Sequence, residues 1–174
     1  MIRLNDVVVS YRTVRGSINA VDGVQLEIPD GCIVGIAGGS GCGKSTLMKA
    51  IYGDIEAPMS LSAGFIEYGF KDEKGAPVTS ETVRKEWFKS LSYVPQSSMN
   101  SMNPVIRIRE QFIDFPGTDA NKKRVLEHVR EYIGKLGLPS EALDSFPHQL
   151  SGGMRQRMMI ALATFFQPNL IIAD

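Results

Sequence analysis

The chain has 174 residues, of which 43% are hydrophobic and 22% charged, with 19 basic and 19 acidic side chains. This length predicts a single domain with a real hydrophobic core, and the composition excludes a disordered protein. Because the charges balance, the whole chain offers no electrostatic argument for binding a nucleic acid or an anionic membrane.

Cysteine content and hydropathy exclude two further classes. Cys32 and Cys42 are too few for a disulfide scaffold and lack CxxC spacing, so we expect reduced thiols, as in a cytosolic protein. The longest nearly apolar stretch, residues 158–166, is much shorter than the roughly 20 residues of a membrane-spanning helix. The N-terminus contains Asp6 and lacks the features of a signal peptide.

The first third of the chain predicts strands and then one helix. Residues 2–11 and 21–28 have strand composition, and the second segment ends in the turn sequence PDG. The apolar run CIVGIA, residues 32–37, predicts a strand buried on both faces. A cluster of glycines follows it, and residues 44–55 have apolar side chains at helical spacing.

This cluster fits the pattern G-x-x-x-x-G-K-[ST] of a phosphate-binding loop. Glycines let backbone N–H groups point toward phosphate oxygens, and the next helix offers its positive N-terminus. A chance glycine-rich turn is the alternative, but the predicted strand before and helix after favour the loop. We expect Lys44 to reach the β- and γ-phosphates, Ser45 to bind Mg²⁺ and Thr46 to add a phosphate contact. The nucleotide-binding residues predicted here are Gly38, Gly39, Ser40, Gly41, Cys42, Gly43, Lys44, Ser45 and Thr46.

The remaining sequence alternates short strands with helices. Residues 65–70 and 91–94 predict strands, and residues 81–90 predict a helix between them. Residues 125–136 carry apolar side chains on one helical face, with Gly137 and Pro139 as stop signals. A last helix is expected from about Ser151 until Pro168 breaks it. Residues 170–173 then predict a buried strand that leads to Asp174.

Residues 150–157, LSGGMRQR, form a second motif downstream of the phosphate loop. Together the two motifs strongly resemble those of ABC ATPases. The resemblance implies an α/β fold: a P-loop NTPase core with a mostly parallel sheet, an antiparallel β subdomain and an α-helical subdomain. We expect one ABC ATPase domain over residues 1–174. Its core and antiparallel part would cover residues 1–95, its helical subdomain 96–149, and its signature helix and Walker B strand 150–174.

The resemblance also assigns residues outside the phosphate loop. Tyr11 lies where the family has an aromatic that stacks on adenine, Gln96 where it has the Q-loop glutamine, and Asp174 where it has the Walker B aspartate. Lys44, Gln96 and Asp174 are the predicted catalytic residues, and Ser45, Gln96 and Asp174 the predicted magnesium ligands. The signature contributes Ser151, Gly152, Gly153 and Gln156 to nucleotide binding. Taken alone, Tyr11 would be a core tyrosine, Gln96 a surface glutamine and Ser151 a helix N-cap.

In this family two ATPase domains sandwich two ATP molecules, and each signature faces the nucleotide of the other subunit. The resemblance therefore implies ATP and Mg²⁺ as cofactors and a second ABC ATPase subunit as partner. It further implies transmembrane permease subunits, indirectly a solute-binding protein, and no nucleic acid. The protein would lie in the cytoplasm, peripheral on the inner face of the cell membrane.

Three segments resemble one branch, the dipeptide and oligopeptide importers. They are residues 98–104 after Gln96, residues 146–150 before the signature, and Met154 within it. Similar ATPases serve nickel and oligosaccharide importers, so the cargo stays open. A DNA-repair ABC ATPase would insert a long coiled coil into residues 97–150, where no heptads occur. A translation ABC protein would carry two cassettes. A fragment that only binds nucleotide is a further alternative.

The resemblance makes one prediction about completeness. In the family a glutamate that polarises the attacking water directly follows the Walker B aspartate, and a histidine that contacts the γ-phosphate comes later. A further strand normally lies between the phosphate-loop strand and the Walker B strand. None of these follows Asp174 here. We therefore expect a piece of a longer ATPase, lacking the C-terminal part of the core, that is poorly stable and does not hydrolyse ATP alone.

Overall fold

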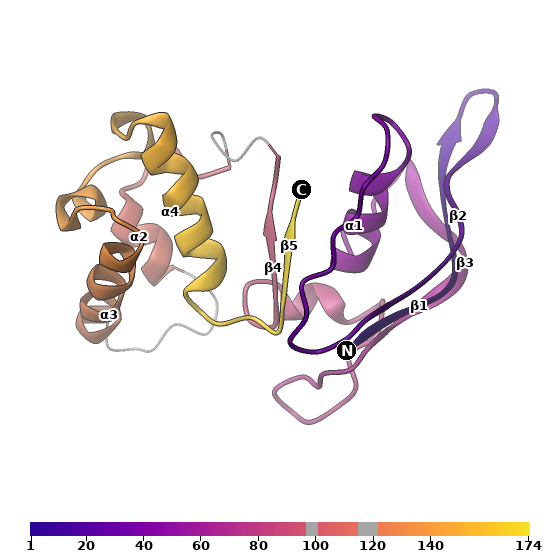
Figure 1. The fold of residues 1–174 in the computed structure, drawn as a ribbon, viewed down its shortest axis with the longest axis horizontal. Helices are drawn as coiled ribbons and strands as arrows, with labels where there is room; N and C mark the ends of the chain where they lie inside the picture. The colour runs from indigo at the N-terminus through magenta and orange to yellow at the C-terminus, as the bar shows by residue number, and fades with distance from the viewer. Residues whose placement is uncertain (97–100, 115–121) are drawn as a thin grey trace. The chain divides into compact units, whose positions relative to one another are not determined.

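The computed structural model describes residues 1–96, 101–114 and 122–174 (Figure 1). The chain forms two compact units, Met1–Glu86 and Trp87–Asp174, and each is described by itself. The predicted boundaries at residues 95 and 149 inside one ATPase domain stay a prediction.

The first unit is built on a three-stranded antiparallel sheet in the order β2-β1-β3. Its strands are β1 (Ile2–Thr13), β2 (Gly16–Ile28) and β3 (Met59–Tyr68). The two strands predicted first are confirmed, although β2 starts five residues earlier, at Gly16 instead of 21. The third begins at Met59, earlier than the predicted 65–70. Buried side chains of β1, among them Leu4, Val7 and Val9, face the core.

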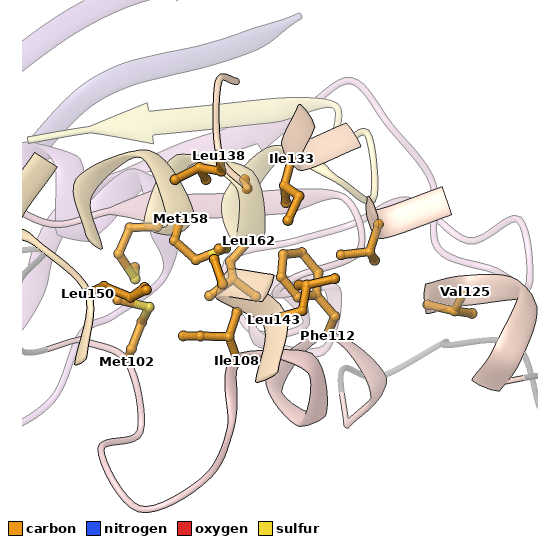
Figure 2. Close-up of a cluster of buried hydrophobic side chains, with 14 residues drawn as sticks. Met102, Ile108, Phe112, Val125, Ile133, Leu138, Leu143, Leu150, Met158 and Leu162 are labelled. Carbon is orange, nitrogen blue, oxygen red and sulfur yellow. The ribbon is translucent and has the colours of Figure 1, made fainter. Parts of the chain in front are cut away.

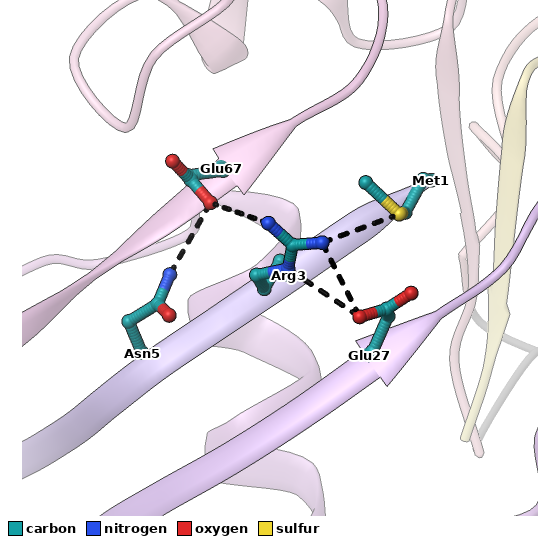
Figure 3. A network of polar contacts seen from close by, with 5 residues as sticks. All are labelled: Met1, Arg3, Asn5, Glu27 and Glu67. Atoms are coloured by element: carbon teal, nitrogen blue, oxygen red, sulfur yellow. Dashed lines mark hydrogen bonds and ion pairs between the residues drawn. The ribbon is translucent and has the colours of Figure 1, made fainter.

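A polar network ties the outer face of this sheet together (Figure 3). Arg3 of the central strand contacts Glu27 of β2 at 3.3 Å and Glu67 of β3 at 3.8 Å. The Asn5 amide also donates to Glu67, at 3.3 Å. These side chains are about half exposed, so the ion pairs add little to stability, and the backbone ladders set the strand order.

Helix α1 (Lys44–Tyr52) packs against the sheet through Leu47, Ala50 and Ile51. It ends earlier than the predicted 55, because Gly53 turns the chain at φ 79° and a side chain there would meet Val83 at 2.3 Å. The Tyr68 hydroxyl of β3 donates to the carbonyl of Ile51 at 2.7 Å, and burial raises the pKa of this phenol. The phenol therefore stays neutral and fixes the end of the helix.

The prediction of a buried strand over residues 32–37 is wrong for the part of the chain that the structure describes. These residues form no helix or strand and are exposed, and the Ile33 side chain is fully so. An apolar run becomes a buried strand only where neighbouring strands bond to its backbone and layers cover both faces. Neither described ladder, β2-β1-β3 or β4-β5, includes this segment.

The prediction of a helix over residues 81–90 is also largely wrong, because only one 3₁₀ turn forms there, η1 (Val83–Glu86). The Thr82 hydroxyl accepts a hydrogen bond from the Thr79 backbone at 2.9 Å, which favours a tight turn over a longer helix. Phe88 then takes a left-handed conformation, and its N–H donates to the carbonyl of Leu91 at 2.7 Å. This turn directs the chain into the next strand.

The second unit combines one parallel strand pair with a helical cluster. β4 (Leu91–Val94) and β5 (Leu170–Ala173) confirm the two strands predicted from short apolar runs, and they pair with each other in parallel. The burial predicted for residues 170–173 is wrong for most of the strand, because Ile172 is buried whereas Ile171 and Ala173 are exposed. The helices are α2 (Ile108–Ile113), α3 (Lys122–Lys135) and α4 (Gly152–Thr164), with 3₁₀ turns η3 (Ser140–Asp144) and η4 (Pro147–Gln149). The predicted helices near 125–136 and after Ser151 are confirmed.

The helices of the second unit share one hydrophobic core (Figure 2). Its fully buried side chains come from each helix: Ile108 and Phe112 of α2, Val129 and Ile133 of α3, and Met158 and Ala161 of α4. Arg157 of α4 contacts the C-terminal end of α3, where it donates to the carbonyls of Leu136 at 3.2 Å and Gly137 at 2.9 Å. A cation beside a helix C-terminus also complements its dipole.

Across the described ranges, no helix combines the length and the hydropathy that crossing a bilayer requires.

Candidate functional site

The glycine loop of residues 38–43 leads directly into α1, as predicted. Gly43 is the N-cap of this helix at φ 94°. A side chain at Gly43 would come within 2.2 Å of the carbonyl oxygen of Ala20 on β2. Only glycine tolerates both this conformation and this approach, so the sheet holds the start of the helix close to its own backbone.

The start of α1 is arranged to receive an anion. The first turn contains no acidic residue, and no side chain caps the helix at Gly43. The first N–H groups of a helix lack intrahelical acceptors, and the helix dipole adds positive potential there. With the Lys44 ammonium in the same turn, this end of the helix favours a phosphate.

Lys44 folds back over the glycine loop. Its Nζ donates to the carbonyls of Gly38 at 2.9 Å and Gly39 at 2.7 Å, and it lies 3.7 Å from Sγ of Cys42. The ammonium is thus held inside the loop by neutral acceptors. An anionic oxygen in the same place would bind it more strongly, because charge-assisted hydrogen bonds exceed those to carbonyls.

Tyr11, near the end of β1, contacts the same helix. Its hydroxyl lies 3.2 Å from Oγ1 of Thr46, within the first turn of α1. Both side chains are partly buried. The structure therefore brings Tyr11, Lys44 and Thr46 together in the first unit, and Ser45 lies exposed between the last two.

The second unit carries Gln96 and Asp174 at one edge of its strand pair. β4 and β5 run parallel with Val94 opposite Ala173, and the N–H of Asp174 donates to the carbonyl of Val94 at 3.0 Å. Gln96 follows β4 as an exposed turn residue. Each residue follows the carboxyl end of its strand. The carboxyl ends of strands are where open α/β sheets bind ligands.

Ser151 begins α4 as its N-cap, as the plainer alternative to a nucleotide contact predicts. Its Oγ accepts a hydrogen bond from the N–H of Met154 at 3.3 Å. The first turn of α4 has no acidic residue, and Ser151, Gly153 and Gln156 are exposed. The cap does not exclude a ligand, because a hydroxyl that accepts one hydrogen bond can still donate another.

One contact of this edge escaped the sequence analysis. The Tyr93 hydroxyl of β4 donates to a carboxylate oxygen of Asp174 at 3.0 Å. Strand pairing sets Tyr93 opposite Ile172, so that it lies diagonal to Asp174 on the same face. A predicted parallel pairing of residues 91–94 with 170–173 would have indicated that Tyr93 lies beside Asp174.

Part of the segment used to assign the importer branch lies outside the described residues. Residues 97–100 are not described, whereas Ser101, Met102, Asn103 and Pro104 are. Met102 belongs to the hydrophobic core of the second unit, with 3% of its surface exposed. Its side chain is thus explained by packing.

A glycine loop that caps a helix, with a lysine folded into it, defines the class of P-loop nucleotide-binding proteins. Residues 21–174 match the family model described as ABC transporter. The chain belongs to the ABC transporter family and carries its ATP-binding cassette fold.

Two relatives of the chain are named as peptide transport ATP-binding proteins. The dipeptide transport ATP-binding protein DppD of Caldanaerobacter subterraneus subsp. tengcongensis is 33% identical, over 100% of this chain and 54% of that protein. The oligopeptide transport ATP-binding protein OppD of Bacillus subtilis (strain 168) is 31% identical, over 100% of this chain and 49% of that protein. The chain therefore spans about half the length of the curated relatives it matches.

Among solved structures the chain is similar to MJ0796, a bacterial ABC transporter cassette. The dimeric structure of MJ0796 aligns with a TM-score of 0.77 and 26% identity, over 100% of this chain and 73% of that one. A post-hydrolysis state of MJ0796, bound to ADP and Pi, aligns with a TM-score of 0.73 and 27% identity over the same shares.

Proposed function

We propose that this chain is the ATP-binding part of an ABC importer that couples ATP binding and hydrolysis to the uptake of dipeptides or oligopeptides. The observation that carries the proposal is the pair of helix starts, α1 after the glycine loop and α4 after LSGG, in one ABC cassette. The names of the relatives, dipeptide and oligopeptide transport ATP-binding proteins, favour peptides as the cargo.

The proposed nucleotide contacts are those that the family resemblance assigns, and the contacts of Lys44 in the first unit support them. Tyr11 would stack on adenine, the loop from Gly38 to Gly43 would surround the phosphates, and Lys44 would exchange its carbonyl acceptors for phosphate oxygens. Thr46, in the first turn of α1, would add a hydroxyl donor. Positioning and charge neutralisation of this kind supply most of the catalysis in phosphoryl transfer.

Mg²⁺ is proposed from the chemistry of three side chains, one in the first unit and two in the second. The Ser45 hydroxyl, the Gln96 amide and the Asp174 carboxylate are hard oxygen donors, which Mg²⁺ prefers. Among the described residues, no group of three or more His, Cys, Asp or Glu side chains is placed so that it could hold a metal ion. The ion would supply charge neutralisation at the phosphates.

The proposed partners follow from the cassette. A second ABC ATPase subunit would place its nucleotide against Ser151, Gly152, Gly153 and Gln156, where α4 offers a helix N-terminus without acidic neighbours. The dimeric structure of MJ0796 supports such a pairing. Transmembrane permeases would hold the pair at the inner face of the membrane, and a solute-binding protein would deliver the cargo.

The phosphate contact of Lys44 is the first test. Lys44→Ala removes a charge-assisted hydrogen bond worth roughly 1.5–3 kcal/mol, so ATP affinity should fall about 10- to 150-fold. Calorimetric titration of ATP into the protein measures this change. Lys49→Ala is the matched control, because Lys49 is an exposed lysine in the last turn of the same helix. Equal affinities of Lys44→Ala and the unchanged protein would overturn the proposed site.

We also propose that ATP hydrolysis needs more polypeptide than these 174 residues. Two observations support this: the exposed run at residues 32–37 and the roughly half-length match to the relatives. We expect phosphate release at background level from the 174-residue chain and steady turnover from the longest natural polypeptide that contains it. Lys44→Ala in the longer polypeptide sets the background. Steady turnover by a cooperatively folded 174-residue chain would contradict this proposal.

A further inference from the structure

The hydroxyl pair formed by Tyr11 and Thr46 joins the two halves of the proposed nucleotide site. The phenol oxygen lies 3.2 Å from Oγ1 of Thr46, and either oxygen can be the donor. Tyr11 lies on the central strand of the sheet, and Thr46 lies in the first turn of α1. A side chain that only stacked on a base would not need this hydroxyl contact.

The Thr46 hydroxyl can accept a hydrogen bond and donate another at the same time. A threonine hydroxyl has one proton to donate and can accept two hydrogen bonds. When Tyr11 donates to Thr46, the proton of Thr46 is available to an anion at the start of α1. This start has no acidic residue and no side-chain cap at Gly43, so it favours such an anion. A hydroxyl that accepts a hydrogen bond also becomes a stronger donor.

The position of both groups is fixed by the fold. Gly43 lies so close to the carbonyl of Ala20 on β2 that a side chain there would clash, so the start of α1 lies close to the sheet. Tyr11 pairs with Ile18 of β2 and with Met59 of β3, which holds its backbone on both sides. The contact between Tyr11 and Thr46 is therefore set by two rigid elements of one unit.

We infer that Tyr11 is a positioning residue for the phosphates as well as a platform for the base: its hydroxyl donates to Thr46 and directs the Thr46 proton to the bound phosphate chain. This inference rests on the proposed function. It assigns to the Tyr11 hydroxyl a part in triphosphate affinity that does not depend on adenine.

Tripolyphosphate, which has no base, separates this part from stacking. Tyr11→Phe keeps the ring but removes the hydroxyl, and we expect it to weaken tripolyphosphate binding about 2- to 10-fold, the range for one neutral hydrogen bond. Titration calorimetry in EDTA, on the natural polypeptide that carries this sequence, measures the affinity without a metal contribution. Tyr68→Phe is the matched control, because its hydroxyl bonds the far end of α1 and should not affect the affinity.

A double-mutant cycle tests the route through Thr46. Thr46→Val should weaken tripolyphosphate binding, whereas Thr46→Ser, which keeps the hydroxyl, should bind like the unchanged protein. Tyr11→Phe should cause no further loss of affinity in the Thr46→Val background. The inference would be wrong if Tyr11→Phe left the tripolyphosphate affinity unchanged, or if the losses from Tyr11→Phe and Thr46→Val simply added. In either case Lys44→Ala should still lose tripolyphosphate binding, so the proposed site would stand. If Lys44→Ala bound tripolyphosphate as well as the unchanged protein, the proposed function itself would fail.

Discussion

Single residues in this chain combine a structural bond with a proposed functional one. Ser151 caps α4 through the N–H of Met154 and is also proposed to face a nucleotide. Lys44 is held by two loop carbonyls and is also proposed to bind phosphate. A substitution at such a position can remove both the structural hydrogen bond and the proposed ligand contact. An informative variant keeps the structural bond and changes only the ligand contact.

Aspartate provides such a variant at Ser151, because it caps helices as well as serine does. We expect Ser151→Asp to leave the melting temperature and ATP binding by the monomer nearly unchanged. Its carboxylate would repel the phosphates of the opposite subunit, so ATP-driven dimerisation should be lost. Size-exclusion chromatography with ATP and light scattering would measure the dimer.

Ser140→Asp supplies the control for that experiment, since it adds the same charge at an exposed serine of the same unit. It should dimerise like the unchanged protein. If Ser151→Asp dimerised equally well, Ser151 would be a helix cap without a role across the dimer.

How far the sequence predicts the site differs between residues. The loop, Lys44 and the cap at Ser151 follow from local spacing, because neighbours in sequence form them. The contacts of Tyr11 with Thr46 and of Tyr93 with Asp174 join distant segments. They depend on how a helix lies on a sheet and which strands pair, and no local pattern contains that information.

Among the elements, α3, β4 and β5 were predicted from the sequence, whereas the helix predicted over residues 81–90 is only a 3₁₀ turn. The apolar spacing of residues 125–136 identified the buried face of α3, with Val125, Val129 and Ile133. Residues 91–94 and 170–173 form β4 and β5 because each supplies the backbone partner of the other. Residues 32–37 have the same strand composition but no partner strand among the described residues, so composition alone predicted them wrongly.

The α3 core face makes a stability prediction at the element scale. Ile133 is fully buried, and Ile133→Ala should destabilise the protein by about 2–5 kcal/mol through lost burial and a cavity. Thermal or urea unfolding measures this loss. Lys135→Ala, two residues later on the exposed face, should shift the melting temperature far less. Equal shifts would mean that α3 does not pack as described.

Across the whole molecule the proposed chemistry is divided between two units. The first unit carries Tyr11, the phosphate loop and Lys44, and the second carries Gln96, Ser151 and Asp174. The first unit holds the proposed contacts to base and phosphate, whereas the residues proposed for turnover and dimerisation lie in the second. We therefore expect loss of nucleotide binding and loss of hydrolysis to be separable defects in variants of this protein.

The exposed run of residues 32–37 has a practical consequence for handling the protein. It presents apolar side chains and a backbone outside any described ladder, and Cys32 lies within it as an exposed thiol. Such a segment offers its hydrogen-bonding groups to other chains as readily as to its own. We therefore expect dilute, reducing solutions to keep the chains apart, and concentrated or oxidising solutions to favour precipitation and disulfide-linked pairs.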